Sequence, residues 1–328
     1  MLILNAEDVR RALPMKEAVE AMKQAFAALS AGNALTPPRI HMEMERNSGI
    51  SLFMPAYVDS ENVEQQALTI KAVSLFDHNH SKGLARIQAA VLVLEPDTGR
   101  PVAVLEGATI TAIRTAAASG AATDFLARQD SSRLAVLGAG VQARSHIDAV
   151  CAVRDIKFVS IYSRTPEKVA ALIDDIHSRF DFVVSADSAR GAVSEADIVC
   201  STTTAQTPVF DDADIGPGTH INAVGSYQPH VREVPPETVI RSRVVVDNRE
   251  AAWEEAGDLI QPLEAGQISR DHIYAELGEL VAGEKSGRDD DGQITFFKSV
   301  GISVQDAFAA QVALSNAKKL NIGQTVDW

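Results

Sequence analysis

The amino-acid sequence predicts an α/β protein in which a doubly wound parallel sheet is joined to a smaller α+β domain. Three observations support this prediction. From residue 131 onward, apolar strand patterns alternate with helical patterns, which is typical of a parallel sheet covered by helices. A glycine turn at 138–140 connects the first of these strands to the next helix, as in nucleotide-binding folds. Before residue 107 the strand patterns are short and closely spaced, which indicates antiparallel pairing.

The length and the charge of the chain limit what it can be. At 328 residues it exceeds one average domain, and we expect two: residues 1–115 with 303–328, and residues 116–302. The formal net charge of −14 argues against a nucleic-acid or anionic-membrane partner, because such surfaces need clustered lysine and arginine. No leader-like start and no apolar stretch of about 18 residues occurs, so we expect a cytoplasmic protein.

Cysteine and histidine are too sparse to predict a metal centre. Cys151 and Cys200 are the only cysteines, and CxxC and HExxH patterns are absent. The eight histidines are scattered apart from His78 and His80. Cys151 falls in a helical pattern and Cys200 near a strand end, so we expect reduced core thiols, no disulfide and no bound metal.

The smaller domain begins with a helix. Apolar residues recur every three or four positions over 15–31, and Gly32 with Asn33 ends this pattern. Proline and glycine within 95–100 predict a hairpin turn, and an alanine-rich stretch at 109–128 predicts a helix that leads into the second domain. Alternating or fully apolar runs predict strands at 39–44, 50–55, 67–74, 87–95 and 101–106.

The larger domain alternates between the two kinds of element. Strands are predicted at 133–137, 158–162, 182–184, 197–202, 219–224 and 243–247. Helices are predicted at 143–153, 187–196, 235–240, 250–259 and 272–281. The charged stretch 285–293 predicts an exposed loop, and the alanine-rich helix 303–319 is expected to return to the first domain, where Asp306 caps or braces it.

The glycine turn predicts a Rossmann-type dinucleotide site. Gly138 permits the tight turn, Gly140 lets the backbone approach a pyrophosphate, and Ala143, in place of a third glycine, lets helix and strand pack closely. Free N–H groups at the helix start, with a dipole charge of about +0.5, favour an anion there. The residues expected to contact the dinucleotide at this turn are Gly138, Ala139, Gly140, Val141 and Gln142.

The next strand ends in Ser163-Arg164-Thr165 and not in an acidic residue. An acidic residue there would bind ribose hydroxyls and mark NAD, whereas a small hydroxyl residue followed by arginine can hold a ribose phosphate. The three residues therefore favour NADP over NAD. A second interpretation is compatible with the first: Thr165 caps the helix that begins at Pro166, and Arg164 is a solvated surface charge.

Two further strand ends carry small or polar residues, Thr202-Thr203 and Val224-Gly225. Open parallel sheets bind ligands outside the carboxyl ends of their strands, so we expect these four residues to line the cofactor cleft. Polar strand ends also occur without a ligand, and position alone does not decide between the two.

Four blocks of sequence, in this order along the chain, resemble the ornithine cyclodeaminase/mu-crystallin family. They are Pro96 to Gly99 with Pro101, Gly107 with Ile110 to Ser119, Gly138 to Ala143, and Ile294 to Gly301. The resemblance implies a homodimer built through the N-terminal strand domain, a Rossmann domain for the dinucleotide, and a substrate pocket between the two domains. It also implies hydride exchange at a carbon that bears nitrogen and a neighbouring carboxylate.

The resemblance implies that Arg39, Lys71 and Arg114 contact the substrate. The planar fork of arginine suits two carboxylate oxygens. Lys71 lies in an apolar run, and a partly buried lysine with a lowered pKa can exchange a proton with the substrate nitrogen. From the residues alone, an ordinary salt bridge is the simpler interpretation of each.

One position departs from the cyclodeaminase pattern. In cyclodeaminases an aspartate that handles the amine follows the glycine after the fifth strand, two residues before a proline, and Tyr227 stands at that place here. A phenol keeps its proton near neutral pH and cannot replace a carboxylate base. We expect Tyr227 to shape the pocket, to donate a hydrogen bond, or simply to pack beside the nicotinamide.

Three other positions are weaker candidates. His78 follows Phe76-Asp77 in a loop and can reach the substrate, although exposed loop histidines are the commoner case. Lys298 and Ser299 match the family block that closes over the cofactor, and we expect them to be cofactor contacts.

Together these observations predict an NAD(P)-dependent oxidoreductase that reduces a small 2-imino acid to an amino acid, or catalyses the reverse dehydrogenation. The expected cofactor is NADP or NAD, with NADP favoured. The expected partners are the small-molecule substrate and a second copy of the chain, with no nucleic acid and no membrane. Two alternatives stay open: an ornithine- or lysine-type cyclodeaminase with bound NAD, and a mu-crystallin-like protein that binds a ligand together with NADPH.

Overall fold

The computed structural model describes residues 1–62 and 66–328, which form two compact units. Unit 1 comprises Met1–Arg114 and Ile302–Trp328, and unit 2 comprises Thr115–Gly301. Each unit is built on its own eight-stranded sheet. The chain therefore starts unit 1, builds the whole of unit 2, and then returns to finish unit 1.

The sheet of unit 1 has the strand order β16-β1-β7-β6-β5-β4-β2, and β3 also pairs with β4. Neighbouring strands are antiparallel, as predicted, except for the parallel pair β1 and β7. The strands are β1 (Leu2–Leu4), β2 (Ala34–Leu35), β3 (Ile40–Met44), β4 (Gly49–Val58), β5 (Ala67–Phe76), β6 (Ile87–Leu94), β7 (Pro101–Glu106) and β16 (Gln324–Thr325). Short 3-10 helices η1 (Glu45–Asn47) and η3 (Asp77–Lys82) follow β3 and β5.

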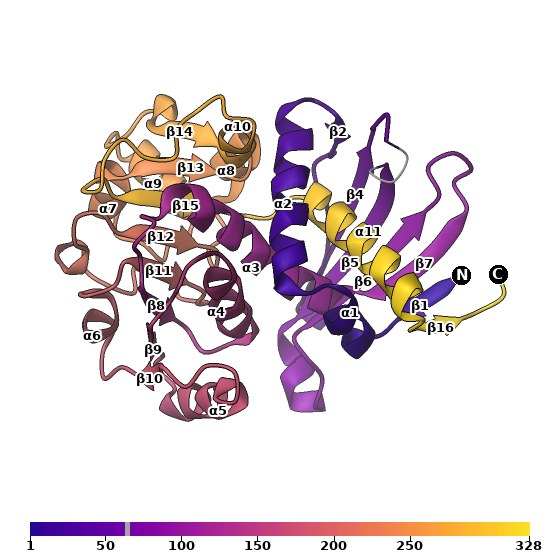
Figure 1. The fold of residues 1–328 in the computed structure, drawn as a ribbon, viewed down its shortest axis with the longest axis horizontal. Coiled ribbons are helices and arrows are strands. Elements are labelled where there is room, and N and C mark those ends of the chain that lie inside the picture. Colours follow the sequence, from indigo (N-terminus) through magenta and orange to yellow (C-terminus); the bar gives the residue numbers. More distant parts are fainter. Residues whose placement is uncertain (63–65) are drawn as a thin grey trace. The chain divides into compact units, whose positions relative to one another are not determined.

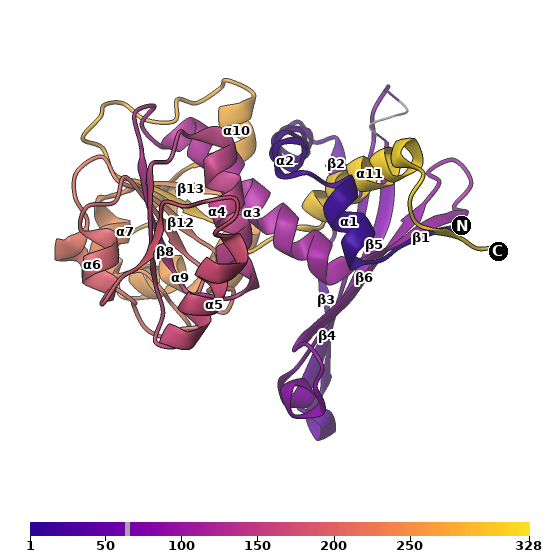
Figure 2. The same ribbon diagram turned by 60° about the horizontal axis from the view of Figure 1, so that its bottom comes forward.

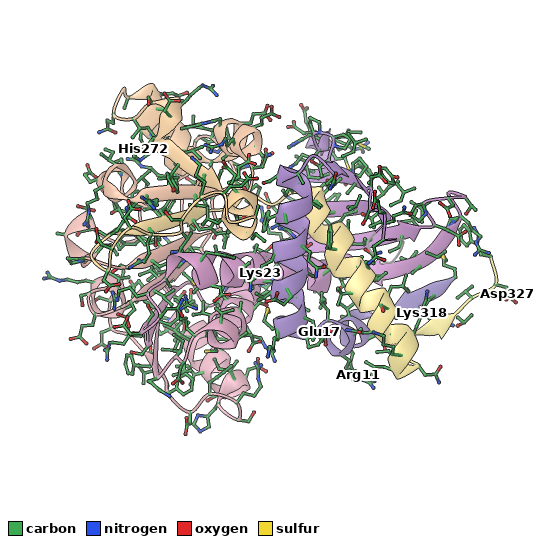
Figure 3. All side chains as sticks on the ribbon, turned by 45° about the horizontal axis from the view of Figure 1, so that its top comes forward. Arg11, Glu17, Lys23, His272, Lys318 and Asp327 are labelled. Atoms are coloured by element: carbon green, nitrogen blue, oxygen red, sulfur yellow. The ribbon has the colours of Figure 1, made fainter. Side chains whose placement is uncertain are left out.

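Helices cover one face of this sheet. α11 (Ser303–Leu320) packs on β4, β5 and β6, α2 (Met15–Ser30) packs on α11, and α1 (Ala6–Ala12) contacts α11 and β7 (Figures 1 and 2). Glu17, labelled on α2 in Figure 3, accepts a hydrogen bond from the Asn316 amide of α11 at 2.6 Å. The last helix of the chain thus packs within the unit that the first part of the chain builds.

Burial alternates along β5, as expected for a strand with one covered face. Thr69, Lys71, Val73 and Leu75 are buried, whereas Ile70 is 38% exposed. Strand pairing places Ile40, Met42 and Ile70 on the same, uncovered side of the sheet. Ile40 is 61% and Met42 49% exposed, so this side of unit 1 keeps apolar side chains in solvent.

The helix α3 (Gly107–Leu126) starts in unit 1 and continues into unit 2. Both carboxylate oxygens of Glu106 accept hydrogen bonds from its first turn, from the N–H groups of Ala108 and Thr109, which satisfies donors that a helix start leaves unpaired. A Cβ at Gly107 would lie 2.8 Å from the backbone of Ala89 on β6, so this helix start packs directly against the sheet of unit 1.

The sheet of unit 2 is parallel throughout, with the order β10-β9-β8-β11-β12-β15-β13-β14. The order reverses between β8 and β11, which defines a doubly wound Rossmann-type sheet with its switch point there. The strands are β8 (Arg133–Leu137), β9 (Phe158–Tyr162), β10 (Val183–Ser185), β11 (Ile198–Ser201), β12 (His220–Ala223), β13 (Arg243–Val246), β14 (Ile273–Glu276) and β15 (Thr295–Lys298).

Helices cover both faces of this sheet (Figure 2). Leu134 and Val136 of β8 pack into one core with α4 (Val141–Val153) and α5 (Pro166–Ile176). Ala135 and Leu137 point to the other face, into a core with α6 (Ala189–Val193), α7 (Pro236–Arg241), α8 (Arg249–Glu255) and α9 (Gly257–Glu264). A strand that is buried on both faces reads as a continuous apolar run, which is why the sequence predicts β8 at its observed ends.

The far end of unit 2 differs from the prediction. The helix expected at 250–259 is interrupted at Ala256, the C-cap of α8 and N-cap of α9. The helix expected at 272–281 is wrong in its first half, which is β14, and right in its second, which is α10 (Leu277–Val281). β15 was not predicted, although it lies inside the sheet between β12 and β13.

Both cysteines are free, as predicted. Burial raises the pKa of the Cys151 and Cys200 thiols to about 12, so both stay protonated and unreactive near neutral pH. Within residues 1–62 and 66–328, no helix combines the length and apolar character needed to cross a membrane. In the same residues no group of three His, Cys, Asp or Glu side chains is arranged to hold a metal ion.

Candidate active site

The turn after β8 has the geometry of a phosphate-binding turn. Gly138 has φ +106°, a conformation that L side chains rarely adopt, and a Cβ there would lie 2.8 Å from the Thr202 carbonyl oxygen. A Cβ at Gly140 would meet no atom within 4 Å. α4 begins directly after Gly140 without a side-chain cap, so its first N–H groups can bind an anion.

A cavity of about 550 Å³ lies beside this turn in unit 2. Its walls come from the ends of β8, β9 and β11, which is where a doubly wound sheet binds a dinucleotide. The predicted cofactor residues that line it are Gly138, Ala139, Gly140, Ser163, Arg164, Thr165, Thr202 and Thr203. Val141 and Gln142 lie in the adjacent first turn of α4, and Val224 and Gly225 follow β12.

The wall at the end of β9 is polar and basic. Among the described residues that line the cavity none is acidic, whereas Arg164 and Lys168 are both present and exposed. Thr165 occupies the N-cap position of α5 with Pro166 after it, as the sequence predicts, but its side chain makes no capping hydrogen bond. The Ser163 hydroxyl instead accepts a hydrogen bond from the Thr165 N–H at 3.4 Å.

Unit 1 brings two of the three predicted basic residues, Lys71 and Arg114, together around one carboxylate, and the charge of the third, Arg39, acts on Lys71. Lys71 on β5 forms an ion pair with Asp306 on α11 (Nζ to Oδ2, 2.6 Å), and Arg114 on α3 donates from Nε to the other oxygen of Asp306 at 3.2 Å. Nη1 of Arg114 also donates to the Gln305 amide oxygen at 2.9 Å. We call Lys71, Arg114, Gln305 and Asp306 the cation cluster.

The cation cluster is buried, and this changes the acidity of Lys71. The Lys71 and Asp306 side chains are each 1% exposed. Burial is the largest influence and, together with the positive charges of Arg114 and Arg39, it lowers the pKa of Lys71 to about 8, while Asp306 opposes the shift. A lysine in this range holds its proton near neutral pH and can give it up readily.

Sequence patterns do not predict Asp306 or Gln305 as members of this cluster. They predict that Asp306 caps or braces the last helix; it does lie in the first turn of α11, but its carboxylate binds Lys71 and Arg114. The available signal was a charged residue in an alanine-rich helix, because a buried charge needs a partner. Its partners lie roughly 190 and 235 residues earlier in the chain, beyond the range of pattern analysis.

The remaining candidates are distributed over both units. Tyr227 is half-buried and packs against the core on the α6 to α9 side of unit 2. His78 is exposed in η3, after the end of β5. Lys298 is fully buried and pairs with Asp258 at 2.8 Å, and the buried Ser299 hydroxyl donates to Asp247. Cofactor contact by Lys298 or Ser299 stays a prediction.

The Rossmann-type sheet with a cavity at its switch point fits an enzyme that uses a nicotinamide dinucleotide, and the comparisons with known proteins show this class, an NAD(P)-dependent oxidoreductase. The chain belongs to the ornithine cyclodeaminase/mu-crystallin family, whose model matches residues 1–321.

Three relatives illustrate the match. The chain is 38% identical over 332 residues to the Delta(1)-pyrroline-2-carboxylate reductase of Bacillus cereus strain ATCC 10987 / NRS 248, with all of both chains covered. It is similar to the structure of Thermococcus litoralis Delta(1)-pyrroline-2-carboxylate reductase in complex with NADH and L-proline, with TM-score 0.94, 41% identity and 99% and 100% of the two chains covered. It is also similar to the structure of the iminosuccinate reductase of Paracoccus denitrificans in complex with NAD+, with TM-score 0.91 and 27% identity, and the match covers 100% of this chain and 99% of that one.

Proposed function

We propose that this protein reduces a small 2-imino acid to the amino acid, with Delta(1)-pyrroline-2-carboxylate as the first candidate substrate. The observation that carries the proposal is the cation cluster, in which a buried lysine and a buried arginine share one carboxylate. An imino acid requires a cation for its carboxylate and a proton donor for its nitrogen. The pyrroline-2-carboxylate reductases among the relatives make a cyclic imino acid the best starting point.

Each residue of the cluster has a defined task in this proposal. The hydrogen bonds of Arg114 within the cluster use Nε and Nη1, which leaves Nη2 to donate to the substrate carboxylate. Arg39 lies close enough to influence the pKa of Lys71 and supplies a second cation for that carboxylate. The Lys71 ammonium donates its proton to the imine nitrogen as the C=N bond is reduced. The bound reduced cofactor supplies the hydride that the carbon accepts.

Cofactor choice is proposed from the wall at the end of β9. Arg164, next to Ser163 and one helical turn from Lys168, provides positive charge where an NAD-specific site would provide a carboxylate. We therefore propose that NADPH is preferred, with NADH also accepted. The T. litoralis relative was solved with NADH, so the preference needs a direct comparison of both cofactors.

The uncovered apolar side of the unit 1 sheet supports a homodimer. Ile40 and Met42 on β3 and Ile70 on β5 lie on this side with 61%, 49% and 38% exposure, and a large exposed apolar face marks an interface. Sedimentation velocity on the wild type and on Ile70→Glu tests this. A monomeric wild type would contradict it.

The catalytic proposal is tested by following NADPH and NADH oxidation with purified protein. The panel comprises Delta(1)-pyrroline-2-carboxylate, iminosuccinate, and pyruvate or glyoxylate mixed with ammonia or methylamine. We expect turnover with at least one imine, and absence of turnover across the panel would refute the proposal. Release of ammonia from ornithine without added cofactor would instead establish a cyclodeaminase, which the presence of Tyr227 in place of an aspartate argues against.

A further inference from the structure

A single buried carboxylate in unit 2 binds two loops at the carboxyl edge of the sheet. One loop follows β11 and the other follows β12. Glu233, 0% exposed, lies between β12 and α7. Its Oε1 accepts hydrogen bonds from the Ser201 hydroxyl at 2.9 Å, and from the N–H and hydroxyl of Thr203 at 2.7 and 2.6 Å. Its Oε2 accepts from the N–H groups of Gly225 and Ser226 at 2.7 and 3.1 Å.

The two loops belong to the half of the fold that receives the nicotinamide. A Rossmann-type sheet binds one mononucleotide on each side of its switch point. The β9 end lies on the side that recognises the adenosine ribose, so β11 and β12 lie on the nicotinamide side. Thr203 follows β11 and lines the cavity, and Gly225 follows β12, two residues before Tyr227.

The packing between these loops leaves little freedom. A Cβ at Gly225 would lie 2.0 Å from the Thr203 carbonyl oxygen and 2.5 Å from Glu233 Oε2. The position therefore excludes every residue except glycine, and the spacing of the two loops depends on the carboxylate that lies between them.

The backbone of Glu233 is fixed by a second buried carboxylate, that of Asp258. Asp258, in the first turn of α9, accepts hydrogen bonds from the N–H groups of Glu233 and Val234 at 2.8 and 3.0 Å. The other oxygen of Asp258 pairs with Lys298 at 2.8 Å, and both side chains are 0% exposed. The Glu233 carboxylate is surrounded by five hydrogen-bond donors, three backbone N–H groups and two hydroxyls. An ionised carboxylate only accepts hydrogen bonds, so these donors fit the ionised form. Burial and the neighbouring charge of Asp258 raise the pKa of Glu233, and the Lys298 charge and the Thr203 donors oppose that rise.

We propose that Glu233, supported by Asp258 and Lys298, is a positioning residue that fixes the nicotinamide end of the cofactor site. It acts through Thr203, Gly225 and Ser226 and does not touch the cofactor. The proposal rests on the proposed function only in that the ligand is a nicotinamide dinucleotide. It gives Lys298 an indirect role in place of the direct cofactor contact suggested by sequence.

The first test measures the binding of two ligands to the full-length protein in the absence of any imine. ADP-ribose shares the adenosine and pyrophosphate portion of NADH and lacks the nicotinamide. For Glu233→Gln, whose NH₂ group would face N–H donors, we expect NADH to bind about tenfold more weakly and ADP-ribose to bind within twofold of wild type. Single-turnover hydride transfer to the best imine should also slow about tenfold.

Glu276→Gln is the matched control. Glu276 is the last residue of β14, and its carboxylate also accepts a backbone hydrogen bond, from the Arg249 N–H at 2.7 Å. It lies at the β13–β14 edge of the sheet. This variant should keep the affinities for both ligands. If wild-type protein binds neither NADH nor NADPH, the proposed function fails first, which is a different result.

Ser201→Ala keeps the proposal testable if Glu233→Gln does not fold. Ser201 is 0% exposed and cannot reach a ligand, so its hydroxyl can affect binding only through Glu233. We expect a two- to threefold loss of NADH affinity with unchanged ADP-ribose affinity. Wild-type NADH affinity and single-turnover rate in the folded variants, with only a lower melting temperature, would overturn the proposal, as would equal losses for both ligands.

Discussion

The acidity of Lys71 should control the pH dependence of imine reduction, and Asp306 should control that acidity. If the Lys71 ammonium is the proton donor, kcat/KM falls tenfold per pH unit above the lysine pKa of about 8. Asp306→Asn removes the negative charge 2.6 Å from Nζ. Burial and the positive charge of Arg114 both lower the pKa of Lys71, and the charge that opposes them is gone in this variant, so the pKa must fall.

The size of this effect follows from the distance. Two unit charges 2.6 Å apart attract by about 6 kcal/mol at an effective dielectric constant of about 20, which corresponds to about four pKa units. Even half of this would bring the pKa of Lys71 to about 6 or below. At pH 7.5 only a few per cent of the lysine would stay protonated, so kcat/KM should fall roughly 20- to 50-fold.

The assay is a pH profile of kcat/KM for the best imine, measured for the wild type and three variants. Asp306→Asn should move the basic limb to lower pH, and Arg114→Gln should move it to higher pH while raising KM. Glu95→Gln removes a partly exposed carboxylate of the same unit that pairs with Arg100 and should change nothing. A basic limb that stays in place in Asp306→Asn, in protein shown to be folded by circular dichroism, would refute the assignment of Lys71 as donor.

Three further predictions concern unit 2. Arg154→Ala should lower the free energy of unfolding, measured in urea titrations, by about 3–5 kcal/mol. The buried Arg154 guanidinium donates to four backbone carbonyls at and just after the end of α3 and to the Asp124 carboxylate. A loss below about 1 kcal/mol would contradict the reasoning. Gly138→Ala should cost about 1–3 kcal/mol and weaken NADPH binding measured by calorimetry, since the turn has φ +106° and abuts Thr202; wild-type affinity would count against the phosphate turn. Arg164→Ala should lower kcat/KM at least tenfold for NADPH and less than twofold for NADH, and equal losses would remove the proposed ribose-phosphate contact.

Local patterns were sufficient for the elements that are defined by their own residues. β8 and β9 lie where predicted because buried parallel strands are continuous apolar runs followed by turns. The 272–281 stretch was misassigned because its alanine, glutamate and leucine residues favour helix, while pairing with β13 makes its first half a strand. β15 enters the sheet between β12 and β13 from a distant part of the sequence, and no local pattern predicts such an insertion.

The candidate site divides in the same way. The glycine turn and the Ser163-Arg164-Thr165 segment are local motifs, and their residues line the cavity. Family resemblance predicts Arg39, Lys71 and Arg114, and the structure adds the reason that Lys71 and Arg114 belong together, which is the charge of Asp306. Glu233 and Asp306 were not identified as site residues because each is defined by partners that only the fold brings near.

The position of α11 in the chain imposes an order on biosynthesis. Lys71 and Arg114 leave the ribosome long before Asp306, because all of unit 2 is translated between Arg114 and Ile302. At about 5–20 residues per second, the roughly 190 residues of unit 2 separate these events by about 10–40 seconds. During this interval the helix-facing side of β5 has neither its covering helix nor the counterion of its lysine. Nascent unit 1 is thus an incomplete sheet with two uncompensated cations, and it can close only after unit 2 has had time to fold.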